Sequence, residues 1–230
     1  MKSRSLDIPI TRRGSLLALG GLAAGAFGWK VDSAESAGDG PAGVASGAIS
    51  CVLTPELTEG PYYVSGEKVR SNITEGRPGV PLALALTVVD ASTCKPIKGA
   101  SVDIWHCDAL GVYSGVQGNT GTFMRGVQRT NASGLARFTT VYPGWYTGRA
   151  VHIHVKVHVG GSVVHTGQFF FKDAVTDTVY KRTPYNTRGA RDVRDSSDLI
   201  YRNGGSKSLL TVKKSSTGYI GAITMGVHRS

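Results

Sequence analysis

The chain has 230 residues, with 26 Lys and Arg against 16 Asp and Glu, and a formal net charge of +10. The first 40 residues hold five basic and four acidic side chains, so the remainder still carries +9. Its basic residues are scattered and are not interleaved with aromatic residues, which argues against a nucleic-acid partner. Such a charge favours solubility and attraction to anionic surfaces or acidic substrates.

The first 37 residues are predicted to be a signal peptide of the twin-arginine type. Arg12-Arg13 precedes an apolar run of small residues, Leu16–Trp29, and a polar tract follows. The run is shorter than the ~20 residues that span a bilayer, so we expect export, cleavage at a point left open, and no membrane association afterwards. Residues 38–50 are predicted to be a flexible linker, and residues 51–230 a single folded domain.

Three cysteines, Cys51, Cys94 and Cys107, remain in a chain expected to be exported, which predicts one disulfide and one free thiol. If Leu82–Ala91 and Ser101–Cys107 form a hairpin, Cys94 lies near its turn and Cys107 at its far end. The pair Cys51–Cys94 is therefore favoured. No CxxC spacing is present, which argues against a zinc-thiolate site.

Short segments with strand patterns, separated by turn residues, occupy most of the folded part. The expected strands are Leu82–Val89, Ser101–Trp105, Leu135–Val141, Val151–Val159, Ser162–Phe171, Leu209–Lys213 and Tyr219–Val227. The only helix expected is a short one near Asp173–Tyr180, inside the charged and mostly irregular segment Lys172–Asp198. The pattern predicts an all-β antiparallel sandwich with long loops and little helix.

The segment Val151–Val159 alternates strictly between apolar and polar residues. On a strand, His152 and His154 project from the same face with backbones about 7 Å apart, so both imidazoles can reach one ion. His158 lies too far along the strand to join them. Taken alone, a His-x-His pair is more often a solvated strand face than a metal site.

Two tyrosines and an arginine raise the probability of a site. The turn at Pro143-Gly144 is expected to direct Tyr146 and Arg149 toward the mouth of the histidine strand. Tyr113 lies on a second segment, eight residues beyond Trp105. The alternative is that both tyrosines are strand-end residues with a solvated hydroxyl, and that Arg149 is a surface charge.

In combination, these segments resemble the intradiol ring-cleavage dioxygenases, and most closely their short exported members. The resemblance covers most of residues 51–227 and rests on the following segments: Gly60-Pro61-Tyr62, Trp105 with Tyr113, Pro143-Gly144 with Tyr146, Arg149 with His152 and His154, and Gln168.

The resemblance implies a ferric ion, Fe(3+), held by Tyr113, Tyr146, His152 and His154. Ferric iron favours anionic oxygen and can deprotonate a phenol whose free pKa is ~10. The resemblance further implies a catechol-type substrate and O2, with cleavage between the two hydroxyls to a muconate-type diacid. Tyr146 matches the ligand that leaves when substrate binds.

The remaining roles are carried over in the same way. Arg149 matches a guanidinium that stabilises developing negative charge, Gln168 a supporting polar group, and Gly60, Pro61 and Tyr62 a wall against the substrate ring. Cys107 is expected to be buried and inert. The short stretch between Tyr146 and His152 suggests an open pocket for bulky catechols.

Two other functions remain open from sequence. The chain could be a secreted, non-catalytic β-sandwich binding module, or its two histidines and two oxygens could hold copper or zinc. The identity of the catechol and the formation of a homo-oligomer are also left open.

Overall fold

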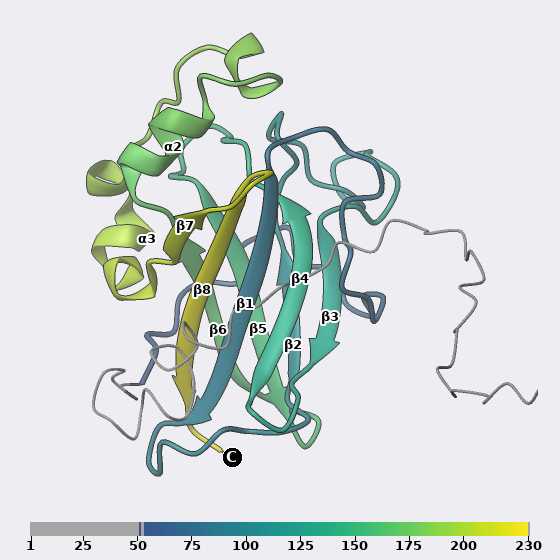
Figure 1. The fold of residues 1–230 in the computed structure, drawn as a ribbon, viewed down its shortest axis with the longest axis vertical. Helices are drawn as coiled ribbons and strands as arrows, with labels where there is room; N and C mark the ends of the chain where they lie inside the picture. The colour runs from purple at the N-terminus through teal and green to yellow at the C-terminus, as the bar shows by residue number, and fades with distance from the viewer. Residues whose placement is uncertain (1–50, 52, 230) are drawn as a thin grey trace, which may run out of the picture. The chain divides into compact units, whose positions relative to one another are not determined.

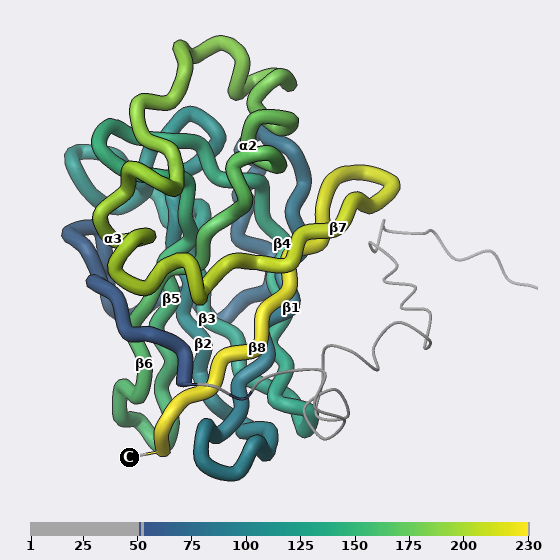
Figure 2. Tube along the Cα trace, turned by 90° about the vertical axis from the view of Figure 1, so that its left-hand side faces the viewer, coloured from purple at the N-terminus to yellow at the C-terminus, as the bar shows by residue number. Residues whose placement is uncertain are grey.

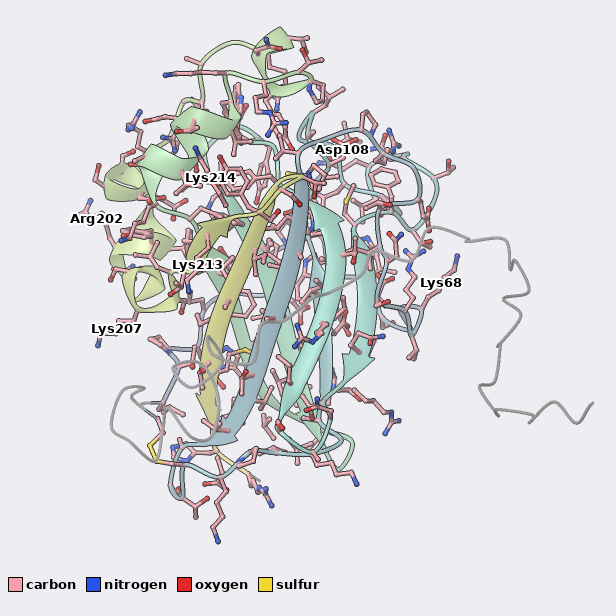
Figure 3. All side chains as sticks on the ribbon, in the orientation of Figure 1. Lys68, Asp108, Arg202, Lys207, Lys213 and Lys214 are labelled. Carbon is pink, nitrogen blue, oxygen red and sulfur yellow. A yellow bond between two sulfur atoms is a disulfide. The ribbon has the colours of Figure 1, made fainter. Side chains whose placement is uncertain are left out.

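The computed structural model describes residues 51 and 53–229. The predicted signal peptide and linker, residues 1–37 and 38–50, lie outside the described residues. Within the described part, no helix is long and apolar enough to cross a bilayer. Exposed basic residues lie on different sides of this part: Lys68 is on one side, and Arg202, Lys207, Lys213 and Lys214 are on another (Figure 3).

Two four-stranded sheets lie face to face (Figure 1), in the orders β4-β1-β8-β7 and β3-β2-β5-β6. Their strands are β1 Pro81–Asp90, β2 Ser101–Trp105, β3 Arg125–Arg129, β4 Leu135–Val141, β5 His152–Val159, β6 Ser162–Phe170, β7 Thr211–Lys214 and β8 Tyr219–Val227. Among the described residues, the helical turns all lie between β6 and β7, and are α2 Asp173–Val179, η1 Tyr185–Thr187, η2 Asp195–Ser197, α3 Leu199–Arg202 and η3 Gly205–Ser208. The predicted all-β sandwich with little helix is therefore confirmed.

The main core fills the space between the sheets because alternate apolar residues of each strand point inward. On β1 these are Leu82, Leu84 and Leu86, while the alternate residues Ala83 and Ala85 are half-buried, so only the second half of β1 is buried on both faces. One pair of neighbours, β1 and β8, runs parallel, so the first sheet is mixed rather than purely antiparallel.

β1 and β2 do not form the hairpin that was considered from the sequence as one possibility. β1 pairs with β4 and β8, whereas β2 pairs with β3 and β5 in the other sheet. The chain between them crosses from one sheet to the other, which alternation within each strand could not reveal. Strand β3 was also missed, because it is only five residues long and three of those are arginine or glutamine.

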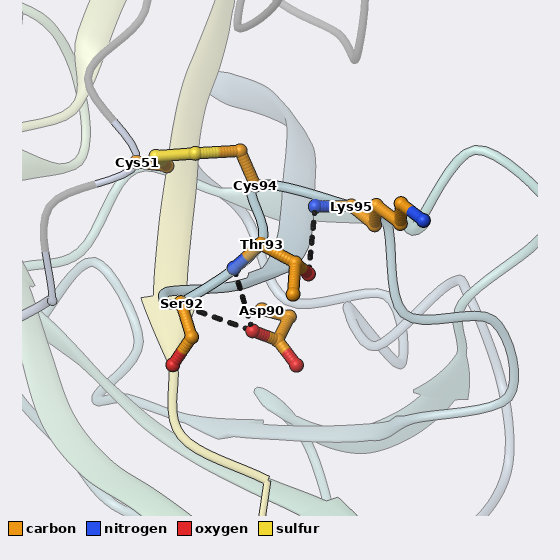
Figure 4. Close-up of a disulfide and its surroundings, with 6 residues drawn as sticks. All are labelled: Cys51, Asp90, Ser92, Thr93, Cys94 and Lys95. Carbon is orange, nitrogen blue, oxygen red and sulfur yellow. Dashed lines mark hydrogen bonds between the residues drawn. A yellow bond between two sulfur atoms is a disulfide. The ribbon is translucent and has the colours of Figure 1, made fainter.

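The Cys51–Cys94 disulfide is nevertheless present (Figure 4). Cys107 is a buried free thiol. The Asp90 carboxylate accepts hydrogen bonds from the N–H groups of Ser92 and Thr93 and shapes the turn that presents Cys94. The disulfide thus joins the start of the described chain to the loop that follows β1.

The polar face of β5 is buried, not solvated. His152, His154 and Lys156 are 2%, 1% and 8% exposed, while the valines and Ile153 of the other face enter the core. The burial comes in large part from the arm, residues 53–72, whose ends pair with β8 and β4 of the first sheet and whose middle part lies along the second sheet, beside β6 in Figure 2. Hydrogen bonds from Leu57 N–H to Thr166 O, 2.9 Å, and from Arg70 N–H to Val127 O, 3.0 Å, fix the arm to β6 and β3.

A glycine lets the arm approach β5 closely. Gly60 has φ +72°, and a Cβ at this position would lie 3.1 Å from Cε1 of His154. Gly66, also in the arm, has φ +78° but has no atom within 4 Å of such a Cβ. The two glycines therefore share a left-handed backbone and differ in their surroundings.

This difference gives a matched pair of substitutions. Gly66→Ala should lower the free energy of unfolding by about 1 kcal/mol through backbone strain alone. Gly60→Ala should lower it by roughly 1 kcal/mol more, because the His154 ring must also shift. Urea unfolding of both variants measures the two losses. Equal losses of unfolding free energy would show that Gly60 is not packed closely against His154.

His165 is a buried histidine on the core side of β6, opposite Val157 of β5. Its Nε2 has no hydrogen-bond partner among the described residues. Burial lowers the pKa of His165 to about 4. The His165 imidazole therefore binds a proton less readily in the folded state than in the unfolded state.

Acid should therefore destabilise the protein through His165. As the pH falls from about 6.5 to about 4, the unfolded state binds a proton that the folded state does not. Relative to His165→Gln, the wild type should lose up to about 3 kcal/mol over that range. Urea unfolding at several pH values measures the difference, and a difference that does not vary with pH would contradict it.

Candidate metal centre and active site

Four side chains from three segments meet above the outer face of the second sheet. His152 and His154 come from β5, Tyr146 from the turn before it, and Tyr113 from the loop between β2 and β3. The Nε2 atoms of the two histidines are 3.1 Å apart, and the Tyr146 hydroxyl is 3.2 Å from His152 Nε2. The Tyr113 ring centroid lies 5.6 Å from that of Tyr146 and 6.3 Å from that of His154. The fold thus brings together all four residues predicted as ligands.

The two imidazoles are oriented by different contacts. His152 Nδ1 lies 2.7 Å from the carbonyl oxygen of Ala150 and donates to it, which leaves the Nε2 lone pair directed at the cluster. The ring of His154 stacks on Trp105, with centroids 4.9 Å apart and planes within 5°. Packing therefore fixes the His154 ring, whose Nδ1 has no partner among the described residues.

The two tyrosines meet because their loops are locked together. Gly144 N–H donates to the Asp108 carbonyl at 2.9 Å, and the Cys107 thiol donates to the Gly144 carbonyl at 3.3 Å. A Cβ on Gly144 would lie 2.5 Å from the carbonyl oxygen of Ala109, so only glycine fits this contact. Cys107 therefore packs beneath the site, as the sequence predicted for a buried thiol.

Burial keeps all four groups uncharged in the protein alone. It raises the pKa of Tyr113 well above its ordinary value and that of Tyr146 to about 12. It lowers the pKa of His152 to about 3 and that of His154 well below its usual range, with the Arg149 charge adding to both effects. Neutral imidazoles are competent metal ligands, whereas the phenols need a strong cation to lose their protons.

The residues fit a ferric ion. The Tyr113 hydroxyl is buried and has no hydrogen-bond partner among the described residues, so an oxygen donor faces the cluster unsatisfied. Two phenolates and two neutral imidazoles form a donor set suited to a hard, highly charged cation. No group of three or more His, Cys, Asp or Glu side chains in the described part is arranged to hold a metal ion.

Arg149 and Gln168 lie beside this cluster and contact one another. Arg149 Nη2 donates to Gln168 Oε1 at 2.6 Å, and Gln168 Nε2 donates to the carbonyl of Thr58 in the arm at 2.9 Å. Gln168 is 1% exposed, so it does not face water. The sequence did not single out Asp198, which accepts a hydrogen bond from Arg149 Nε at 2.8 Å. Its only local signal is that of a helix N-cap before α3.

The residues predicted to line the substrate pocket cover the cluster from the arm. Gly60 lies against His154, and the Tyr62 ring centroid is 4.5 Å from that of Tyr113 and 5.8 Å from that of Tyr146. Gln117 Nε2 donates to the Tyr62 hydroxyl at 3.1 Å. Pro61, which lies between Gly60 and Tyr62 in the sequence, is exposed. Gly60 and Tyr62 thus border the cluster, and Pro61 joins them in the chain.

Comparison with known proteins gives the same family as the sequence motifs. The family model described as Dioxygenase matches residues 58–180. An intradiol ring-cleavage dioxygenase from Tetranychus urticae is 37% identical, with a TM-score of 0.74 over 77% of this chain and 95% of that chain. The dioxygenase domain of a dioxygenase carbohydrate-binding protein fusion from Streptomyces sp. SirexAA-E is 30% identical, with a TM-score of 0.62 over 77% of this chain and 99% of that domain.

Full-length relatives extend beyond the matched region. A chlorocatechol 1,2-dioxygenase from Pseudomonas putida is 28% identical over 50% of this chain, and the match covers only 52% of that protein. The chain thus spans about half the length of this relative. The family model covers more than half of the chain, and the Tetranychus urticae enzyme is matched along nearly its whole length. The chain therefore belongs to the intradiol ring-cleaving dioxygenase family.

Proposed function

We propose that the protein is a non-haem Fe(III) dioxygenase that uses O2 to cleave catechol-type rings between the two hydroxyls, giving muconate-type diacids. The observation that carries this proposal is the convergence of two imidazoles and two phenols, with Nε2 atoms 3.1 Å apart and a phenol 3.2 Å from one of them. Ferric iron, when bound there, supplies a Lewis acid that lowers the pKa values of the phenols and of a catechol.

The two tyrosines differ in how readily they can move. Tyr113 is 3% exposed, whereas Tyr146 lies in the turn before β5 and is half-buried. Tyr146 is therefore the phenol that can swing away when a catechol enters, and its phenolate oxygen can accept one catechol proton. Tyr113 stays in place beneath the Tyr62 ring.

The surrounding residues position the substrate and stabilise charge. Arg149 keeps a fixed positive charge beside the phenols, where negative charge develops as the ring gives up its protons and opens. Gln168 holds one nitrogen of that guanidinium. Gly60, Pro61 and Tyr62 form the wall that confines the flat ring and limits its orientations.

The substrate class is proposed from relatives and from the shape of the site. Matched proteins are named catechol and chlorocatechol 1,2-dioxygenases. Only five residues separate Tyr146 from His152, so that side of the site has a short loop and should admit substituted catechols. We further propose secretion by the twin-arginine route, which the N-terminal sequence of the exported protein would test.

Colour and metal content test the proposed function. The purified protein should contain one iron per chain, show the visible charge-transfer band of an iron-tyrosinate, and take up O2 with catechols, and mass spectrometry should identify the ring-opened diacid. His154→Gln should lower iron content and turnover at least about tenfold, because it replaces an imidazole nitrogen with an amide oxygen that binds metal ions more weakly.

His158→Gln, on the same strand but outside the cluster, is the matched control and should keep both colour and turnover. A colourless, inactive wild type would favour a non-catalytic binding module. Bound copper or zinc with no iron would indicate the other metal site. Full activity of His154→Gln would contradict its assignment as a ligand.

A further inference from the structure

The guanidinium of Arg149 is held by two partners from distant segments. Its Nε donates to Asp198 Oδ2 at 2.8 Å, and its Nη2 donates to Gln168 Oε1 at 2.6 Å. Its Nη1 makes no hydrogen bond to any described residue. An arginine side chain has many rotamers, so two hydrogen bonds in the plane of its head remove most of that freedom. They leave one edge of the guanidinium available.

Asp198 is itself held rigidly. Besides Arg149, its Oδ2 accepts the N–H of Ala150 at 2.8 Å, and its Oδ1 accepts the N–H groups of Ile200 and Tyr201 at 2.8 and 2.9 Å. Its side chain is 0% exposed. Burial acts to raise the pKa of Asp198, but these hydrogen bonds keep it below the ordinary value, so the carboxylate is ionised at neutral pH.

Capping of α3 does not account for this arrangement. The helix Leu199–Arg202 has only four residues and none of them is buried, so its N-cap has no structural need for a fully buried carboxylate. Only Oδ1 of Asp198 serves the helix, whereas Oδ2 serves Arg149 and the start of β5. A buried charge of this kind is costly unless it is paired, and Arg149 is its partner.

We propose that Asp198 is a positioning residue that keeps the Arg149 guanidinium beside Tyr146 and His152, with its free edge available to substrate. The segment between β6 and β7 thus contributes to the site, because it places the Asp198 carboxylate against Arg149. The inference rests on the proposed function in one respect, since it assumes that Arg149 acts on a bound catechol.

Asp198→Asn is the first test. An amide has a single acceptor oxygen, so it cannot accept from the helix N–H groups and from Arg149 at the same time. We expect kcat/KM for catechol to fall roughly 10- to 100-fold. The anaerobic dissociation constant for catechol, read from the change in visible absorption, should change less than about threefold, because the effect is on charge developing during reaction.

Asp192→Asn is the matched control. Asp192 lies in the same segment and its Oδ2 accepts the N–H of Gly148 at 2.9 Å, in the same turn as Arg149, but it does not contact the guanidinium. This variant should stay within about twofold of the wild type. An equal loss of kcat/KM in both variants would mean that any change in this segment lowers activity, whether or not it touches Arg149. That result would overturn the proposal.

Asp198→Ser covers the case in which the amide variant fails to fold. Serine is a good N-cap but is too short to reach Arg149, so the helix keeps its cap while the guanidinium loses its anchor. In an Arg149→Met background, Asp198→Ser should change kcat/KM by less than about twofold, because a positioning residue has no effect without the residue that it positions. A full additional loss in that background would show that Asp198 acts by another route.

A readout that does not depend on turnover separates this inference from the proposed function. The Nε–H proton of Arg149, bonded to the buried carboxylate of Asp198, should exchange slowly with solvent in NMR spectra of the iron-free protein. Asp198→Ser should make this exchange at least about tenfold faster, and Asp192→Asn should not. Unchanged exchange in Asp198→Ser would overturn the inference even if the protein is a dioxygenase, whereas an inactive wild type with the expected exchange pattern would overturn only the proposed function.

Discussion

The arm that crosses the outer face of the second sheet is the contact on which the rest of the site depends. A sandwich normally leaves the outer face of each sheet in water, and the outer face of β5 carries His152, His154 and Lys156. Lys156 forms an ion pair with Glu59 of the arm, and its ammonium lies 3.7 Å from the centre of the Tyr63 ring. These contacts convert a polar strand face into a buried one, where imidazoles stay neutral and fixed.

Burial of that face has an electrostatic consequence for chemistry. Two neutral phenols and two neutral imidazoles can be buried together because none of them carries a charge. A strong cation that binds them displaces the protons of the phenols. The same burial strengthens the effect of the Arg149 charge, because its side chain is 18% exposed and is screened less by solvent than a charge at the surface. Because such a charge is costly when it is mobile or unpaired, the buried Asp198 and Gln168 beside it have a clear physical purpose.

The site is also a meeting point of chain segments that the two sheets hold at fixed separations. β5 contributes the histidines, and the contact of Cys107 and Asp108 with Gly144 joins the loops that carry Tyr113 and Tyr146. The segment between β6 and β7 contributes Asp198, and the arm contributes Gly60 and Tyr62. The sandwich therefore acts as a rigid support, and its long connections supply most of the polar groups.

Local patterns in the sequence determined the strands and much of the site. Alternation identified β5 and placed His152 and His154 on one face, and the turn at Pro143-Gly144 placed Tyr146 near them. Ser101–Trp105, Leu135–Val141 and Tyr219–Val227 were bounded as the structure has them. Gly134 and Gly218 directly precede the last two and mark where they begin. The motifs of the site, taken together, also identified the family.

Only the tertiary structure decided which strands are neighbours and what covers the histidine face. Alternation tells which side of a strand is apolar, but it carries no information on which strand pairs with it. The sequence therefore did not reveal that β1 and β2 lie in different sheets, or that β1 runs parallel to β8. Asp198 was missed for the same reason. Its bond to Arg149 joins residues 49 apart in sequence, and such a contact forms only when the whole chain has packed.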